Sequence, residues 1–224
     1  MTRPSGDAIH RCLSARRAAV ARAVDARRAR RALYRLVGVR RATQSDNCHI
    51  TMLRGLEVVE LSTMAAAPAA CAVLADLGAR VVKVESSLGD EWRSTGRNFG
   101  PKAFGAMFEQ DNRGKSSITL DLQSDAGSQV FHRLLAKADL LVTNVRLRGL
   151  AKLKLDFDTV HACYPQLIYC HLTAWGRTGP RVNDPGYDTG AYGAATGIMD
   201  QQRPSDAADM SRWPVGVGDH AAST

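Results

Sequence analysis

The sequence lacks the features that mark a membrane-spanning or a secreted protein. No stretch approaches about eighteen uninterrupted apolar residues, which excludes an ordinary membrane-spanning helix. The five cysteines are an odd number with no CxxC pair, and no secretory apolar segment precedes them. With 45% hydrophobic and 23% charged residues, the composition is that of a globular chain. We therefore predict a reduced, intracellular and cytoplasmic protein.

The common fingerprints of nucleotide and metal enzymes are also missing. The sequence has no GxGxxG turn and no GxxxxGK loop to hold phosphates. It has no GxSxG nucleophile turn and no HExxH zinc motif. His161 with Cys163 and Cys170 with His171 are close pairs, but they cannot be extended to four ligands with zinc spacing. We predict no metal site.

Negative charge is scarce in residues 1–51, which hold twelve Arg and three Asp, a net charge of +9. Since the whole chain carries +8, residues 52–224 are almost neutral and give no reason to bind nucleic acid. The Arg-rich leader is compatible with a nucleic-acid arm, a helix on an anionic membrane or an organelle presequence. We predict instead that it lies outside the fold, either disordered or preceding a native start at Met52.

Residues 52–224 alternate short apolar strands with helices. The expected strands are 56–61, 80–85, 117–121, 139–144 and 167–173. The expected helices are 69–77, 129–137 and 157–163. This alternation predicts an α/β fold with an open, doubly wound, Rossmann-like and mostly parallel sheet. The stretches 86–116 and 174–190 are expected to be long loops that carry binding or catalysis.

Two local patterns are candidate functional sites. Asp219 follows a Gly-x-Gly turn with little side-chain bulk, so another molecule can approach it closely, although such an Asp is also typical of a turn or a helix cap. Arg146, Arg148, Lys152 and Lys154 follow the carboxyl end of an expected strand, where α/β folds bind ligands. The alternative for this basic cluster is an ordinary solvated helix face.

The order of several segments resembles the family III CoA-transferases of the CaiB/BaiF type. The similar segments are 55–62, 68–79, 81–85, 112–121, 138–144, 165–169, 175–180, 185–188 and 218–219. We therefore expect residues 52–224 to form the N-terminal part of the family's large domain, incomplete relative to the family. Residues 1–51 have no counterpart.

The resemblance implies transfer of CoA from an acyl-CoA to a small carboxylic acid. Asp219 occupies the position of the family's catalytic aspartate, which forms a mixed anhydride and then an aspartyl-CoA thioester. The resemblance also implies coenzyme A as part of the substrate, no metal and a homodimer. Family contacts to CoA correspond here to Met64, Ala65, Leu120, Asp121, Leu122, Gln123, Asn144, Val145, Arg146, Lys152, Pro185, Gly186, Tyr187 and Asp188.

Some positions depart from the family pattern. Ser86 replaces an Arg, Ala65 a Gln and Ala67 a Gly that members of the family carry. Tyr187 stands where the racemase branch has a His, which disfavours acyl-CoA racemisation relative to transfer. Because the family's members are much longer, the alternative expectation is a truncated, inactive chain that still binds CoA.

Overall fold

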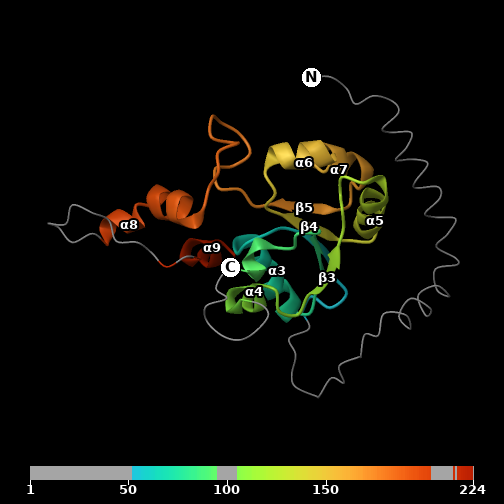
Figure 1. Ribbon diagram of the computed structural model, residues 1–224, viewed down its shortest axis with the longest axis horizontal. Coiled ribbons are helices and arrows are strands. Elements are labelled where there is room, and N and C mark those ends of the chain that lie inside the picture. Colours follow the sequence, from blue (N-terminus) through green and yellow to red (C-terminus); the bar gives the residue numbers. More distant parts are fainter. Residues whose placement is uncertain (1–51, 95–104, 203–213, 215, 224) are drawn as a thin grey trace, which may run out of the picture. The chain divides into compact units, whose positions relative to one another are not determined.

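The computed structural model describes residues 52–94, 105–202, 214 and 216–223. Its five strands form one parallel sheet in the order β3-β2-β1-β4-β5 (Figure 1). They are β1 (Glu57–Leu61), β2 (Arg80–Glu85), β3 (Ser116–Thr119), β4 (Leu140–Thr143) and β5 (Ile168–His171). This is the doubly wound strand order, so the predicted α/β fold class is confirmed. The predictions for the leader, 1–51, lie outside the described residues.

The three expected helices are present, two of them with shifted bounds, and the structure adds shorter elements that the sequence does not predict. Those expected are α3 (Ala66–Asp76), α5 (Asp125–Leu135) and α7 (Phe157–Cys163). Helix α5 begins directly after Ser124, whose hydroxyl accepts a hydrogen bond of 3.1 Å from the N–H of Gly127. The additional elements are η1 (Glu91–Arg93), α4 (Ala106–Asp111), α6 (Leu147–Leu153), η3 (Thr189–Gly193), α8 (Ile198–Gln201) and α9 (Val217–Ala222). The expectation that 86–116 is entirely loop is therefore wrong, since η1 and α4 lie within it.

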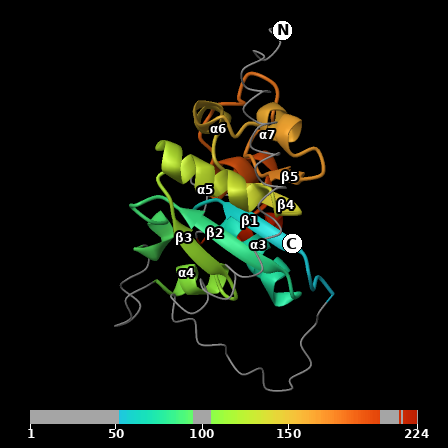
Figure 2. The same ribbon diagram turned by 90° about the vertical axis from the view of Figure 1, so that its right-hand side faces the viewer.

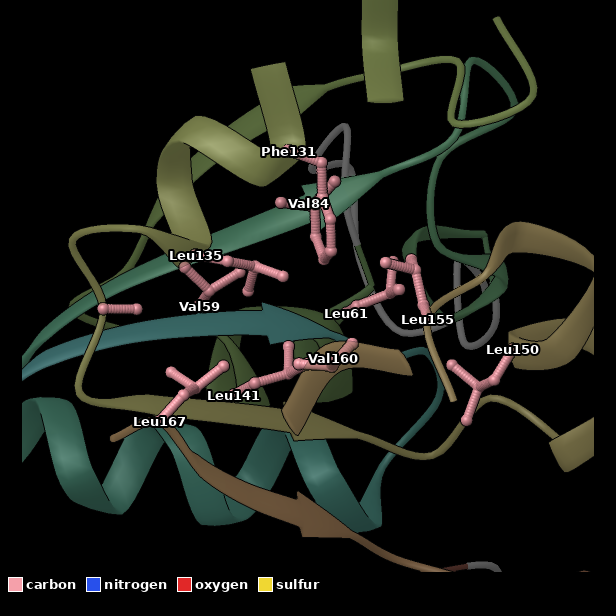
Figure 3. Close-up of a cluster of buried hydrophobic side chains, with 11 residues drawn as sticks. Val59, Leu61, Val84, Phe131, Leu135, Leu141, Leu150, Leu155, Val160 and Leu167 are labelled. Carbon is pink, nitrogen blue, oxygen red and sulfur yellow. The ribbon is translucent and has the colours of Figure 1, made fainter. Parts of the chain in front are cut away.

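The strands bury side chains on both faces of the sheet, because helices cover both faces (Figure 2). On one face, Phe131 and Leu135 of α5 pack toward Val59, as Figure 3 shows. On the other face, Val58 packs against Ala67 and Cys71 of α3. The small side chains of α3 allow this helix to approach the sheet closely. At the carboxyl edge of the sheet, β1 and β4 are paired through Leu61 and Thr143, and loops follow both strands.

The described part of the chain offers no helix long and apolar enough to cross a membrane. Two of its cysteines, Cys71 and Cys170, are free thiols.

Replacing Leu135 by Ala should lower the free energy of unfolding by about 2–5 kcal/mol, because the side chain is completely buried in the main cluster. The matched control is Leu88→Ala, at a leucine that is 95% exposed, which should change stability by less than about 0.5 kcal/mol. Urea unfolding of both variants measures the difference. Equal midpoints for the two variants would contradict this packing.

Candidate active site

The turn after β1 lies beside the end of β4, where the strand order reverses. The side chain of Asn144 accepts a hydrogen bond of 3.0 Å from the N–H of Thr63 and donates one of 2.7 Å to the carbonyl of the same residue. The next residue, Met64, has a left-handed backbone with φ of 68°. Ligands of doubly wound sheets bind where the strand order reverses, and the predicted contacts Met64, Ala65 and Asn144 lie there at the ends of β1 and β4.

A buried network of charges lies under this turn. The ammonium nitrogen of Lys83 is 2.8 Å from Glu60 Oε1 and 2.9 Å from Asp90 Oδ2, and it donates to the carbonyl of Ser62 at 3.0 Å. The other Glu60 oxygen lies 2.7 Å from the ammonium nitrogen of Lys115. All four charged side chains are at most 2% exposed. Two positive and two negative groups thus neutralise one another inside the protein.

The combined attraction of the neighbouring carboxylates changes the pKa of Lys83 more than burial does. Burial alone would lower its pKa, but the charges of Glu60 and Asp90 raise it above the ordinary lysine value. Lys83 is therefore protonated, and its ammonium group pairs with Asp90. Asp90 Oδ1 in turn accepts hydrogen bonds of 3.0 Å from the N–H groups of Met64 and Trp92. The network thereby supports the unusual backbone of Met64.

A second ion pair holds the segment that follows β2. Arg93 donates hydrogen bonds of 2.8 and 2.7 Å to the two carboxylate oxygens of Glu85. Burial would raise the pKa of Glu85, but hydrogen bonds from Arg93 and Ser117 lower it to about 2. The segment between them carries Ser86, which is exposed. Glu85 also accepts the N–H of Asp90 at 3.1 Å, so this pair braces the network described above.

Asp219 lies in the first turn of α9, a short helix anchored at both ends. Before the helix, the N–H of Gly216 donates to Asp188 Oδ2 at 2.8 Å, and Gly216 has a left-handed φ of 93°. At the other end, the hydroxyl of Ser223 donates to the carbonyl of Ala66 at 2.7 Å. Between them Gly218 is buried, and a Cβ there would lie 2.7 Å from the side chain of Tyr192. Asp219 is consequently held near the start of α3 and beside Asp188, another predicted site residue.

The surroundings of Asp219 are partly desolvated and rich in negative charge. Burial raises its pKa above the ordinary aspartate value, and the nearby carboxylates of Asp188 and Asp111 raise it further. The charge of His220 acts in the opposite direction. A partly desolvated carboxylate of raised pKa is a stronger nucleophile than an ordinary one, provided that it is ionised.

The remaining predicted CoA contacts are distributed over three segments. Because all strands are parallel, the segments after β1, β3 and β4 emerge at the same edge of the sheet. In the turn after β3, Leu120 and Leu122 pack against the main cluster, so their side chains face the core, and Asp121 accepts the N–H of Gln123 at 3.0 Å. Val145 also packs partly against that cluster.

The basic residues and the 185–188 turn are at the surface. Arg148 and Lys152 are exposed on α6, and Arg146 and Lys154 are exposed at the residues that flank it. Pro185, Gly186 and Tyr187 are exposed, and Tyr187 is 67% accessible. The carbonyl of Pro185 accepts a hydrogen bond of 3.2 Å from the indole of Trp175.

The two His and Cys pairs have structural surroundings. His161 stacks on Phe157 with ring centroids 5.1 Å apart. His171 Nε2 lies 2.9 Å from the carbonyl of Val145 and fixes the turn after β4. Within the ranges that the structure covers, no three His, Cys, Asp or Glu side chains form a group able to hold a metal ion.

The strand order defines a doubly wound α/β protein with a candidate ligand site at the carboxyl edge of its sheet. The chain belongs to CoA-transferase family III, whose model matches residues 53–224. The family prediction is therefore confirmed.

Individual relatives support the same assignment. The chain is 36% identical over 174 residues to (R)-2-hydroxy-4-methylpentanoate CoA-transferase of Clostridioides difficile, covering 76% of this chain and 43% of the relative. It is 41% identical over 142 residues to succinate–glutarate CoA-transferase of Agrobacterium fabrum, covering 61% and 36% respectively. A crystal structure of a CaiB/BaiF family protein from Brucella suis is similar with a TM-score of 0.68 and 40% identity, over 75% of this chain and 44% of that one. The chain thus spans less than half the length of these relatives.

Replacing Asp90 by Asn should lower the free energy of unfolding by about 3–5 kcal/mol, because it leaves the ammonium group of Lys83 short of a buried counter-charge. The control is Asp76→Asn, which removes the half-exposed partner of Arg113 and should cost at most about 1 kcal/mol. Guanidinium unfolding at neutral pH compares the two. A loss for Asp90→Asn no larger than that for Asp76→Asn would contradict the role given to the network.

Proposed function

We propose that this protein transfers CoA from an acyl-CoA to a small carboxylic acid, with Asp219 as the nucleophile. The observation that carries the proposal is the anchoring of α9, which holds a half-buried Asp219 beside the start of α3. Family membership and relatives named for CoA transfer support it. The acids in the relatives' names include 2-hydroxy-4-methylpentanoate, succinate and glutarate, so we propose an acceptor of that class.

The proposed reaction begins with attack of an Asp219 carboxylate oxygen on the thioester carbonyl. The carbon–sulfur bond breaks, CoA leaves as the thiolate, and a mixed anhydride of Asp219 and the acyl group remains. The thiolate then attacks the aspartyl carbonyl, which forms an aspartyl-CoA thioester and releases the donor acid. The acceptor carboxylate reverses these two steps and leaves as the new acyl-CoA. Covalent catalysis thus divides one difficult exchange into easier steps, each needing backbone N–H groups to stabilise the oxyanion.

We propose that the CoA moiety lies along the carboxyl edge of the sheet. The turn at Met64 and Ala65, the 120–123 turn and the 144–146 segment all emerge there. The exposed cations Arg146 and Lys152 supply charge for the phosphates of CoA. Asn144 joins the end of β4 to the turn after β1 through its two hydrogen bonds to Thr63. We also predict a homodimer, as the family resemblance implies.

A second candidate is binding of CoA thioesters without turnover. The chain spans less than half the length of the CoA-transferases that it resembles, so binding and turnover are tested separately. Calorimetric binding of acyl-CoA together with no exchange of labelled CoA, at protein concentrations that favour assembly, would support this second function over the first.

Replacing Asp219 by Asn should reduce the exchange of labelled CoA between an acyl-CoA and succinate by about a thousandfold or more, because the amide is not a nucleophile. The matched control is Asp184→Asn, at an exposed carboxylate that pairs with Arg181 in the preceding loop. This control should exchange at the parental rate. Undiminished exchange by Asp219→Asn, measured by chromatography of the labelled thioesters, would contradict the proposed mechanism.

A further inference from the structure

His220 follows Asp219 in the sequence and is held by contacts to other segments of the chain. The proposed reaction gives this side chain no role. Its Nε2 atom lies 2.9 Å from Asp111 Oδ1, although the two residues are 109 positions apart in the sequence. Asp111 is 1% exposed, and its second oxygen accepts a hydrogen bond of 3.1 Å from the indole of Trp92. The other side of the imidazole ring lies against Gly216, where a Cβ would be 3.4 Å from Nδ1. The ring is thus fixed between α4 and the start of α9.

Charge around Asp219 is unbalanced without His220. Besides burial, the charges of Asp188, Asp111 and His220 act on the pKa of Asp219. The first two are carboxylates that favour protonation of Asp219, whereas an imidazolium at His220 favours its ionisation. The carboxylate of Asp188 accepts hydrogen bonds from the N–H groups of Gly216 and Thr189. His220 is therefore the neighbour able to offset the two carboxylates.

We infer that His220, clamped by Asp111, is a positioning residue that holds Asp219 in the ionised form at the start of α9. The inference rests on the proposed function, because only a nucleophilic Asp219 needs to be ionised. It adds to that function an acid–base pair, Asp111 with His220. The protonation state of this pair sets the reactivity of Asp219, and neither side chain contacts the substrate.

The protonation state of His220 follows from its contacts. The hydrogen bond to Asp111 raises the pKa of His220, whereas burial lowers it. The charge of Asp111, the hydrogen bond to the backbone of Gly216 and the charge of Asp219 raise this pKa further. Two other elements pack against α9: η3 presents Asp188 and Tyr192, and α3 meets it through the carbonyl of Ala66. His220 is therefore charged at mildly acidic pH and loses its charge as the pH rises through its raised pKa. The stabilisation of the Asp219 carboxylate is lost over the same interval.

The direct test is the titration of Asp219 by carbon-detected NMR of the full chain labelled at the aspartate carboxyl carbons. The signal is assigned by its disappearance in Asp219→Asn. Replacing His220 by Gln retains a hydrogen-bond donor toward Asp111 but removes the positive charge, so the midpoint of the Asp219 titration should move to higher pH. The matched control is His161→Gln on the exposed surface of α7, which should leave the midpoint unchanged.

A second variant keeps the inference testable if His220→Gln perturbs α9. Asp111→Asn leaves His220 in place and preserves an acceptor for Trp92. It should lower the titration midpoint of His220, followed through its ring carbon signals. An Asp219 midpoint in His220→Gln equal to that in His161→Gln, or an unchanged His220 midpoint in Asp111→Asn, would overturn the inference. Neither titration requires turnover, so this result is independent of whether the protein exchanges CoA.

Discussion

The ammonium group of Lys83 is the contact on which the candidate site depends most. It lies within 3.0 Å of oxygens from Glu60, Ser62 and Asp90, in an interior from which water is excluded. An unpaired charge at this depth costs several kcal/mol, so each buried charge of the network depends on its partners. Its outermost member, Asp90, holds the N–H of Met64. The interior of the sheet is thereby coupled to the conformation of the turn after β1.

The second constraint is the anchoring of α9. A helix of six residues has little stability of its own, so its position is decided by tertiary contacts. Three contacts come from distant parts of the chain: Asp188 to the backbone of Gly216, Asp111 to His220, and the carbonyl of Ala66 to Ser223. Together they fix Asp219 among carboxylates, beside a single imidazole. The same three contacts therefore decide both the position of Asp219 and the charges that surround its carboxylate.

The sequence predicts the β-α-β frame well, because apolar runs separated by Pro68 and Gly78 leave few alternatives. It does not predict α4 and α6, which are too short for a clear period. Glu60 and Lys83 interrupt apolar strands and resemble solvent-facing positions. Only the register, which pairs Glu60 with Lys83 across β1 and β2, shows that they are buried together. Asp219 follows from the family resemblance, whereas its pairing partners follow from contacts between distant segments, which the sequence does not specify.

The central claim is that the Asp219 carboxylate receives the acyl group from sulfur. The most direct measurement is mass spectrometry of peptides from protein incubated with acyl-CoA and then quenched with hydroxylamine, which converts an aspartyl anhydride or thioester to a hydroxamate. The account predicts a hydroxamate at Asp219 and none at Asp188 or Asp111. A preparation that exchanges labelled CoA while Asp219 stays unmodified would contradict it.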